Sequence, residues 1–182
     1  AGGTYGYLLS ISPSVEVGNK WLGLVSTDWF DCANWGGLRV PDEFTDVVID
    51  ADADDDIIIS GQTAYTKALQ IDNELLSITV GPDPASRLSI HGNLTITSVM
   101  GFTHSGGDIE LAGSYLQTVS GNIPYFNNLI INNPNGVTFG SEDILVEGTL
   151  TLSKGALTAG YVWVANPDPL AIVSPSATSY IN

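Results

Sequence analysis

The stretch Leu88-Ser89-Ile90-His91-Gly92-Asn93-Leu94 decides the fold, because its pattern returns further along the chain. An apolar pair, a glycine turn and another apolar residue recur in Ile109-Glu110-Leu111-Ala112-Gly113-Ser114-Tyr115 and in Leu145-Val146-Glu147-Gly148-Thr149-Leu150. The first two glycines are 21 residues apart, and the gap of 35 to the third contains a further apolar run, Leu129-Ile130-Ile131. A repeat of about 20 residues is typical of a solenoid that stacks one coil of chain per repeat.

The apolar runs between these repeats read as strands. Each run is short, alternates with a period of two and ends at Gly, Asn, Pro or Asp. The strand-favouring residues (16 Ile, 14 Val and 15 Thr) far outnumber the unbranched helix formers (6 Glu, 3 Lys, 3 Gln, 2 Arg and 1 Met). No window of a dozen residues contains an amphipathic helical stripe. The sequence therefore predicts an all-β chain.

Residues 46–182 are predicted to form a right-handed parallel β-helix, in which each strand pairs with the equivalent strand of the coils above and below. Alternate side chains then point into a narrow apolar interior. Asparagines are expected near the corners, where they tolerate left-handed backbone and could stack in ladders. They are Asn93, Asn122, Asn127, Asn128, Asn132, Asn133 and Asn135. The alternative fold is an antiparallel β-sandwich, which also has short strands and turns every 8–12 residues.

Residues 1–45 have a different character, with little regular alternation and three of the four tryptophans, Trp21, Trp29 and Trp35. The first coil of a solenoid would expose apolar core and open strand edges, so a covering segment is needed. We predict an N-terminal strand followed by a Trp-rich cap. The alternative interpretation is a platform of exposed indole rings that stack on sugars.

The charge balance excludes several classes of partner. The chain has 20 acidic and 5 basic residues, giving a formal net charge of −15. Nucleic acid is excluded as a partner, because binding phosphates needs clustered Lys and Arg. No apolar run approaches the roughly 18 residues of a spanning helix, so no membrane insertion is predicted. Cys32, the single cysteine, cannot form a disulfide within these residues and is expected to be a small buried apolar side chain.

The densest run of acidic residues offers a candidate metal site. Asp52, Asp54 and Asp56 alternate, so an extended backbone would present all three carboxylates on one face. Hard oxygen ligands at that density suit Ca²⁺, the one cofactor that the sequence indicates. The alternative is a solvated acidic loop that maintains solubility and protects a sheet edge.

Asp108 and Glu110 lie two residues apart on a predicted strand and share one face of it. Outward carboxylate pairs can act as acid and base in glycoside hydrolysis, but this pair could equally face water. A polysaccharide lyase on this fold would need a basic residue near bound Ca²⁺. The bases beyond the cap are scattered singly, and none adjoins two carboxylates in sequence: Lys67, Arg87 and Lys154. We therefore expect no catalytic residues and no enzyme.

The entry segment carries a resemblance to a known group of proteins. Trp21-x-Gly23, Ser26-Thr27-Asp28-Trp29, Asn34-Trp35, Val40-Pro41 and Thr45-Asp46-Val47-Val48-Ile49 follow one another in this order. This string resembles the module at the start of β-helical repeat regions in large secreted surface proteins of the Bacteroidetes type.

Later segments fit the same resemblance, which covers roughly residues 20 to 180. They include the stretch from Gly107 to Gly113, that from Phe126 to Asn133, and that from Val146 to Leu152. The resemblance implies an adhesin-like or stalk region exported by type IX secretion, with no particular chemistry. In such proteins the chain continues past a sequence such as Ser179-Tyr180-Ile181-Asn182, so a fragment of a longer protein is expected.

Three functions follow as hypotheses. The first is a structural or adhesive module of a secreted or cell-surface bacterial protein, a rigid β-helical stalk without catalytic activity. Its partners would be other copies or other domains of a surface protein, and glycans. The second is a carbohydrate-binding or polysaccharide-degrading β-helix. The third is a self-assembling extracellular filament subunit, whose open coil ends or N-terminal strand (Tyr7 to Val17) join neighbours by strand addition.

Overall fold

The computed structural model describes residues 20–97, 102–104, 106–123, 125–174 and 178–182. The predicted N-terminal strand from Tyr7 to Val17 lies outside these residues. Apart from one 3₁₀ turn, η2 (Cys32–Asn34), the named elements are β-strands, which confirms the all-β prediction. Within the described residues no helix is both long enough and apolar enough to cross a membrane.

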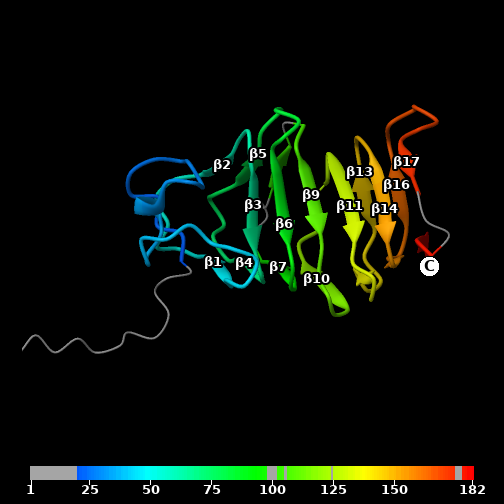
Figure 1. Cartoon of the computed structure of the whole chain (residues 1–182), viewed down its shortest axis with the longest axis horizontal. Helices are drawn as coiled ribbons and strands as arrows, with labels where there is room; N and C mark the ends of the chain where they lie inside the picture. Colours follow the sequence, from blue (N-terminus) through cyan, green and yellow to red (C-terminus); the bar gives the residue numbers. More distant parts are fainter. Residues whose placement is uncertain (1–19, 98–101, 105, 124, 175–177) are drawn as a thin grey trace, which may run out of the picture.

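The strands stack into a solenoid of about six turns with three faces (Figure 1). Face 1 contains β1 (Val47–Ile49), β4 (Leu69–Ile71), β7 (Leu94–Ile96), β10 (Gln117–Gly121), β12 (Val137–Thr138), β15 (Ala156–Thr158) and β18 (Tyr180–Ile181). Face 2 contains β2 (Ile57–Ile59), β5 (Ile78–Val80), β8 (Phe102–His104), β13 (Ile144–Val146) and β16 (Val162–Val164). Face 3 contains β3 (Thr63–Thr66), β6 (Arg87–Ile90), β9 (Asp108–Leu111), β11 (Asn128–Asn132), β14 (Leu150–Lys154) and β17 (Ile172–Val173).

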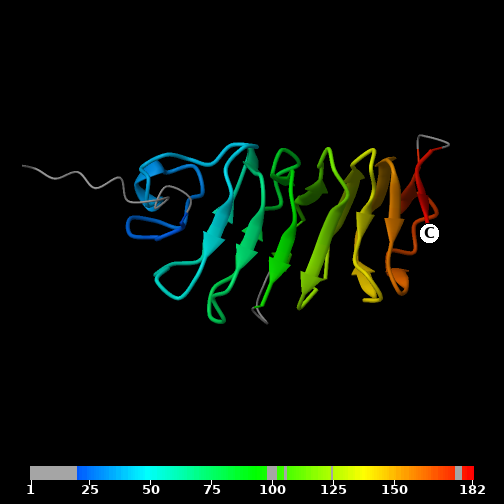
Figure 2. The same ribbon diagram turned by 90° about the horizontal axis from the view of Figure 1, so that it is seen from below.

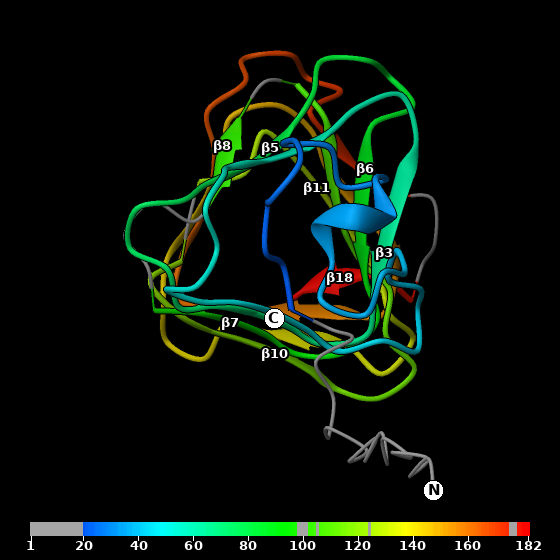
Figure 3. The ribbon, with the colours of Figure 1, turned by 90° about the vertical axis from the view of Figure 1, so that its left-hand side faces the viewer.

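The pairing between these strands is parallel throughout, so the β-helix is confirmed and the antiparallel sandwich is wrong. On face 3, Leu88 pairs with Ile109, Ile109 with Leu129, and Leu129 with Leu150. Viewed from the N-terminal end, the chain runs clockwise from face 1 through face 2 to face 3 as it recedes, which makes the solenoid right-handed (Figure 3). The coils lie side by side along one long axis (Figure 2).

The interior is a continuous file of aliphatic side chains. The four stacked residues of face 3 just named are each 0–2% exposed, and equivalent residues line faces 1 and 2. Alternation places every second side chain of a strand inside, as the period of two predicts. Burial of each Leu, Ile or Val contributes about 1.5–3 kcal/mol, so the coils stabilise one another through this file.

Two details of the predicted repeat are wrong. Leu145 lies on β13 of face 2, where it pairs with Trp163, and so is not the equivalent of the face 3 residue Ile109. Leu94 pairs with Val119 and not with Tyr115, which is exposed. The coils differ in length at their corners, and a glycine turn in the sequence does not fix how many residues form each corner.

The corner asparagines do not adopt the expected left-handed backbone. Among the described residues, a positive φ occurs at Leu38 and at glycines. Several of these asparagine side chains bond to atoms of the neighbouring coil other than the amide of another asparagine. Asn122 Nδ2 donates to the Thr97 carbonyl at 2.8 Å, and Asn128 Oδ1 accepts from the Thr149 amide at 2.9 Å.

The segment before β1 covers the N-terminal end of the solenoid. Trp21, Trp29 and Trp35 are fully buried and pack edge to face, with ring centroids 4.7–5.0 Å apart. Their rings are therefore not available to sugars, and the interpretation as a stacking platform is wrong. Cys32 is exposed on η2, contrary to the expected burial, because this short turn lies on the outside of the cap.

Candidate functional site

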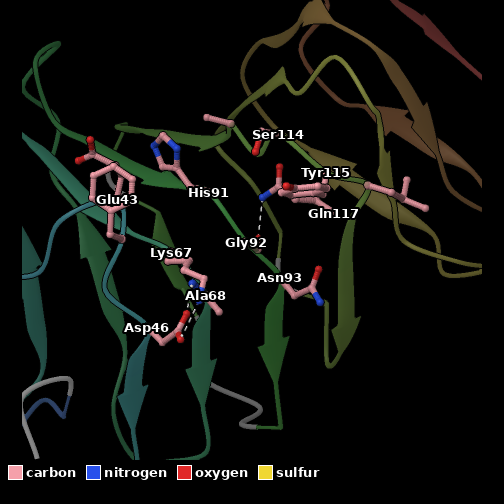
Figure 4. Close-up of a pocket in the computed structure, with 13 residues that line it drawn as sticks. Glu43, Asp46, Lys67, Ala68, His91, Gly92, Asn93, Ser114, Tyr115 and Gln117 are labelled. Atoms are coloured by element: carbon pink, nitrogen blue, oxygen red, sulfur yellow. Dashed lines mark hydrogen bonds and ion pairs between the residues drawn. The ribbon is translucent and has the colours of Figure 1, made fainter. Parts of the chain in front are cut away.

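The strongest candidate site is an open groove of about 690 Å³ on the corners that connect face 3 to face 1 (Figure 4). Two aromatic side chains line its walls: Phe44, on the turn of the coil before the floor, and Tyr115, on the corner of the coil after it. Its floor consists of two successive corners, Lys67-Ala68 and His91-Gly92-Asn93. The other lining residues are Glu43, Asp46, Ala112, Ser114, Leu116 and Gln117.

The Tyr115 wall exists because one corner is longer than the corner beneath it. Three residues separate Ile90 from Leu94, whereas seven separate their partners Leu111 and Val119. The additional residues project from the solenoid as a loop. Tyr115 at the tip of the loop is 83% exposed.

The side chain of Gln117 anchors this loop from inside. It is buried, and its Nε2 donates to the carbonyls of Ile90 (2.9 Å) and Gly92 (2.7 Å). Its Oε1 accepts from the Gly113 amide at 2.8 Å and from Asn133 Nδ2 at 2.9 Å. One buried amide thus ties the loop to the coils on both sides of it.

The next coil holds the loop backbone as well. Asn133 Nδ2 donates to the Tyr115 carbonyl at 2.6 Å, and Asn135 Nδ2 donates to the Ser114 carbonyl at 2.7 Å. A Cβ at Gly113 would lie 2.7 Å from Asn133 Nδ2, so glycine is required there for the amides to approach. The loop that presents Tyr115 is therefore tied to its neighbours through its own backbone, which limits the conformations that it can adopt.

The Phe44 wall is a turn organised by Asp42. Asp42 Oδ1 accepts from Thr45 Oγ1 at 2.6 Å and from the Phe44 amide at 3.2 Å. The hydrogen bond from Thr45, followed by the Phe44 amide and the nearby Arg39 guanidinium, lowers the pKa of Asp42 below 3.8. Phe44 is 78% exposed on this fixed turn.

Polar groups line the floor between the two walls. Asp46 accepts from the Ala68 amide at 3.1 Å and contacts Lys67 Nζ at 3.2 Å. Asn93 Oδ1 accepts from the Thr118 amide at 2.9 Å, and His91 Nε2 lies 3.3 Å from Ser89 Oγ. These contacts fix the orientation of the side chains that face the groove.

A second polar cluster lies on the outer surface of face 3. Asp108 and Glu110 point outward from β9 and so share a face as predicted. Arg87 lies one coil away in direct register with Asp108. Its Nη2 is 2.8 Å from Asp108 Oδ2, and its Nη1 is 3.5 Å from Glu110 Oε2. In the sequence no base adjoins two carboxylates, but the stacking of the coils places Arg87 beside both Asp108 and Glu110.

The remaining oxygens of this pair also have donors. Asn128 Nδ2 donates to Asp108 Oδ1 at 3.1 Å, Asn132 Nδ2 donates to Glu110 Oε1 at 2.8 Å, and Ser89 Oγ donates to Glu110 Oε2 at 3.0 Å. Each carboxylate oxygen is thus engaged by a neighbouring coil. The arrangement braces three successive coils through charge-assisted hydrogen bonds.

The structure does not gather the predicted calcium ligands Asp52, Asp54 and Asp56. Residues 50–56 contain no strand; Asp52 contacts Lys20, and Asp56 Oδ1 accepts from the Ser77 amide at 2.8 Å. Across the described ranges, no group of three or more His, Cys, Asp or Glu side chains is placed to hold a metal ion. Calcium binding by this segment stays a prediction.

Lys20 gives the acidic segment a different role. Its Nζ lies 2.8 Å from Asp50 Oδ2 and also contacts Asp52, so it joins the cap to the turn after β1. Hydrogen bonds to Asp50 and Asp52 raise the pKa of Lys20 above 10.5. Burial acts to raise the pKa of Asp50, but the Lys20 contact and the Asp52 amide outweigh burial and lower it below 3.8.

Sequence reasoning did not find the groove. No motif in the sequence points to Phe44, and the repeat pattern aligns Tyr115 with Leu94. The available signal was the distance between aligned apolar residues, which is 21 from Leu88 to Ile109 but 25 from Leu94 to Val119. No protein-family model matches this chain, and no curated protein or solved structure gives a significant match.

Proposed function

We propose that this chain is a structural and adhesive module of a secreted or cell-surface bacterial protein, without catalytic activity of its own. The observation that carries the proposal is the continuous aliphatic file that joins every coil of a capped solenoid. A rod of this kind holds a surface at a fixed distance and orientation, because each coil is locked to its neighbours along both sides.

The polar features of the surface support the same role. The contacts of Arg87 with Asp108 and Glu110 join neighbouring coils. The ion pair of Lys20 with Asp50 joins the cap to the first coil. Both therefore reinforce the rod. The segment from Trp21 to Ile49 resembles modules of large surface proteins, and this resemblance supports a location outside the cell.

Labelling of intact cells tests the location and the role together. Antibodies raised against the purified chain should label intact cells of the source organism as strongly as permeabilised cells. Labelling that requires permeabilisation would contradict the proposal. So would release of reducing ends or unsaturated uronic acids when the purified chain is incubated with neutral or acidic polysaccharides, with or without Ca²⁺.

A further inference from the structure

We propose that the groove between Phe44 and Tyr115 binds a neutral oligosaccharide, with the two aromatic rings contacting the apolar faces of sugar rings. This inference rests on the proposed adhesive role, because it names the ligand class that such a module recognises. The groove volume of about 690 Å³ lies within the range of roughly 300–1,000 Å³ that is usual for small-molecule sites.

The two walls are exposed aromatic side chains on turns whose backbone is held by hydrogen bonds. Phe44 is 78% exposed and Tyr115 is 83% exposed, so neither ring contributes much to the core. Each nevertheless sits on a backbone fixed by side-chain hydrogen bonds, from Asp42 in one case and from Gln117 and Asn133 in the other. A backbone that is ordered before binding lowers the entropy lost on binding, and an aromatic ring adds only two torsion angles to be fixed when a flat ligand packs against it.

Groups with hydrogen-bonding capacity to spare lie between the rings. In the part of the chain that the structure describes, Asn93 Nδ2, Ser114 Oγ, His91 Nδ1 and the Glu43 carboxylate make no hydrogen bond with another residue. They offer both donors and acceptors. A sugar hydroxyl both donates and accepts, and it is accompanied on the same ring by apolar C–H faces, so a sugar matches both components of the groove.

Two other ligand classes fit less well. A polyanion would meet Glu43 and Asp46 in a chain of net charge −15. An extended peptide would need free backbone donors to add as a strand. The floor amides of Lys67, Gly92 and Ala112 already donate to the preceding coil, at 2.8, 2.6 and 2.8 Å.

The experiment is a titration of the purified chain with neutral hexasaccharides of β-1,4-glucose, β-1,3-glucose, β-1,4-xylose and β-1,4-mannose, followed by calorimetry and by NMR shifts. At least one should bind saturably at millimolar or lower concentration. Tyr115→Ala and Phe44→Ala should each weaken that binding roughly three- to tenfold, and the double variant should abolish it. Tyr125→Ala is the matched control, because this tyrosine is 61% exposed and lies outside the groove. The Tyr125→Ala variant should bind the sugar as tightly as the parent chain does.

The circular dichroism and melting temperature of each variant should match those of the parent chain, because the substituted rings are exposed. The inference is overturned if none of the four sugars binds, if Tyr115→Ala binds as the parent does, or if polygalacturonate or a peptide competes for the groove more strongly than the sugars. If the sugars fail to bind but the antibodies still label intact cells, the oligosaccharide inference is wrong and the proposed surface location is still supported.

Discussion

Arg87 on β6 lies against Asp108 on β9, with Nη2 2.8 Å from Oδ2, although the two residues are 21 positions apart in the chain. The same guanidinium reaches Glu110 at 3.5 Å. The positive charge of Arg87 therefore partly neutralises the negative charges of the two carboxylates on the adjacent coil. In a chain with only five basic residues, this placement couples the stability of neighbouring coils to a single side chain.

Replacing Arg87 should destabilise the solenoid. In Arg87→Gln, the carboxylates of Asp108 and Glu110 remain close together without the guanidinium. We expect the free energy of unfolding in urea to fall by about 1–2 kcal/mol, less than for a fully buried pair because the Arg87 side chain is 35% exposed. Arg39→Gln is the control, since its side chain is 74% exposed, and it should change stability by less than about 0.5 kcal/mol. Equal effects of the two substitutions would contradict the bracing role.

Asn34 should be essential to the cap. Its side chain is fully buried; Oδ1 accepts from the amides of Val25 and Ser26 at 3.0 Å, and Nδ2 donates to the Asp28 carbonyl at 2.9 Å. Asn34→Leu leaves these groups without partners, so we expect a loss of about 2–4 kcal/mol in the free energy of unfolding. Tryptophan fluorescence should also shift to longer wavelength as the indoles become hydrated. An unchanged spectrum and midpoint would show that the cap does not depend on this amide.

Gln117 should hold the loop that carries Tyr115. Gln117→Leu removes the acceptor of the Gly113 amide and the donor to the carbonyls of Ile90 and Gly92. We expect a loss of about 2–3 kcal/mol and faster hydrogen exchange at Gly113. The control is Gln62→Leu, whose exposed side chain should tolerate the change to within about 0.5 kcal/mol. If exchange at Gly113 stays as slow as in the parent, the loop is held by other contacts.

Acid should weaken the attachment of the cap. The pKa of Asp50 is lower in the folded chain than the ordinary 3.8, so its contribution to stability is complete above pH 3.8 and is lost as the pH falls through the lowered value. Lys20 behaves in the opposite way, because its raised pKa makes its contribution complete below pH 10.5 and lost as the pH rises beyond. Unfolding midpoints measured across pH should therefore fall at both extremes. In Asp50→Asn, the decline between pH 4 and pH 2 should be shallower; an identical slope would refute this assignment.

The coil architecture could be predicted from sequence because it depends on local alternation. Leu88, Ile90, Ile109 and Leu111 fall inside whenever strands have a period of two, and they do so in the structure. The pairing of Leu88 with Ile109 followed directly from the spacing of the two glycines. Burial of the cap tryptophans followed from the need to cover the first coil.

The candidate site could not be predicted in the same way, because it depends on which residues meet across coils. The contact between Arg87 and the acids of β9 requires the register of two strands, and the sequence neighbours of Arg87 carry no sign of it. The outward position of Tyr115 depends on four additional residues in one corner, which an alignment of glycines does not count. The turn at Phe44 is defined by side-chain bonds to Asp42 that leave no apolar pattern.

The most direct test of the account is an NMR measurement of which strands are neighbours. The stacked coils predict nuclear Overhauser contacts between backbone protons of Leu88 and Ile109, of Ile109 and Leu129, and of Leu129 and Leu150, in parallel register. Strong contacts between the α-protons of strands that follow one another in the sequence, such as β5 and β6, would show antiparallel hairpins and contradict it.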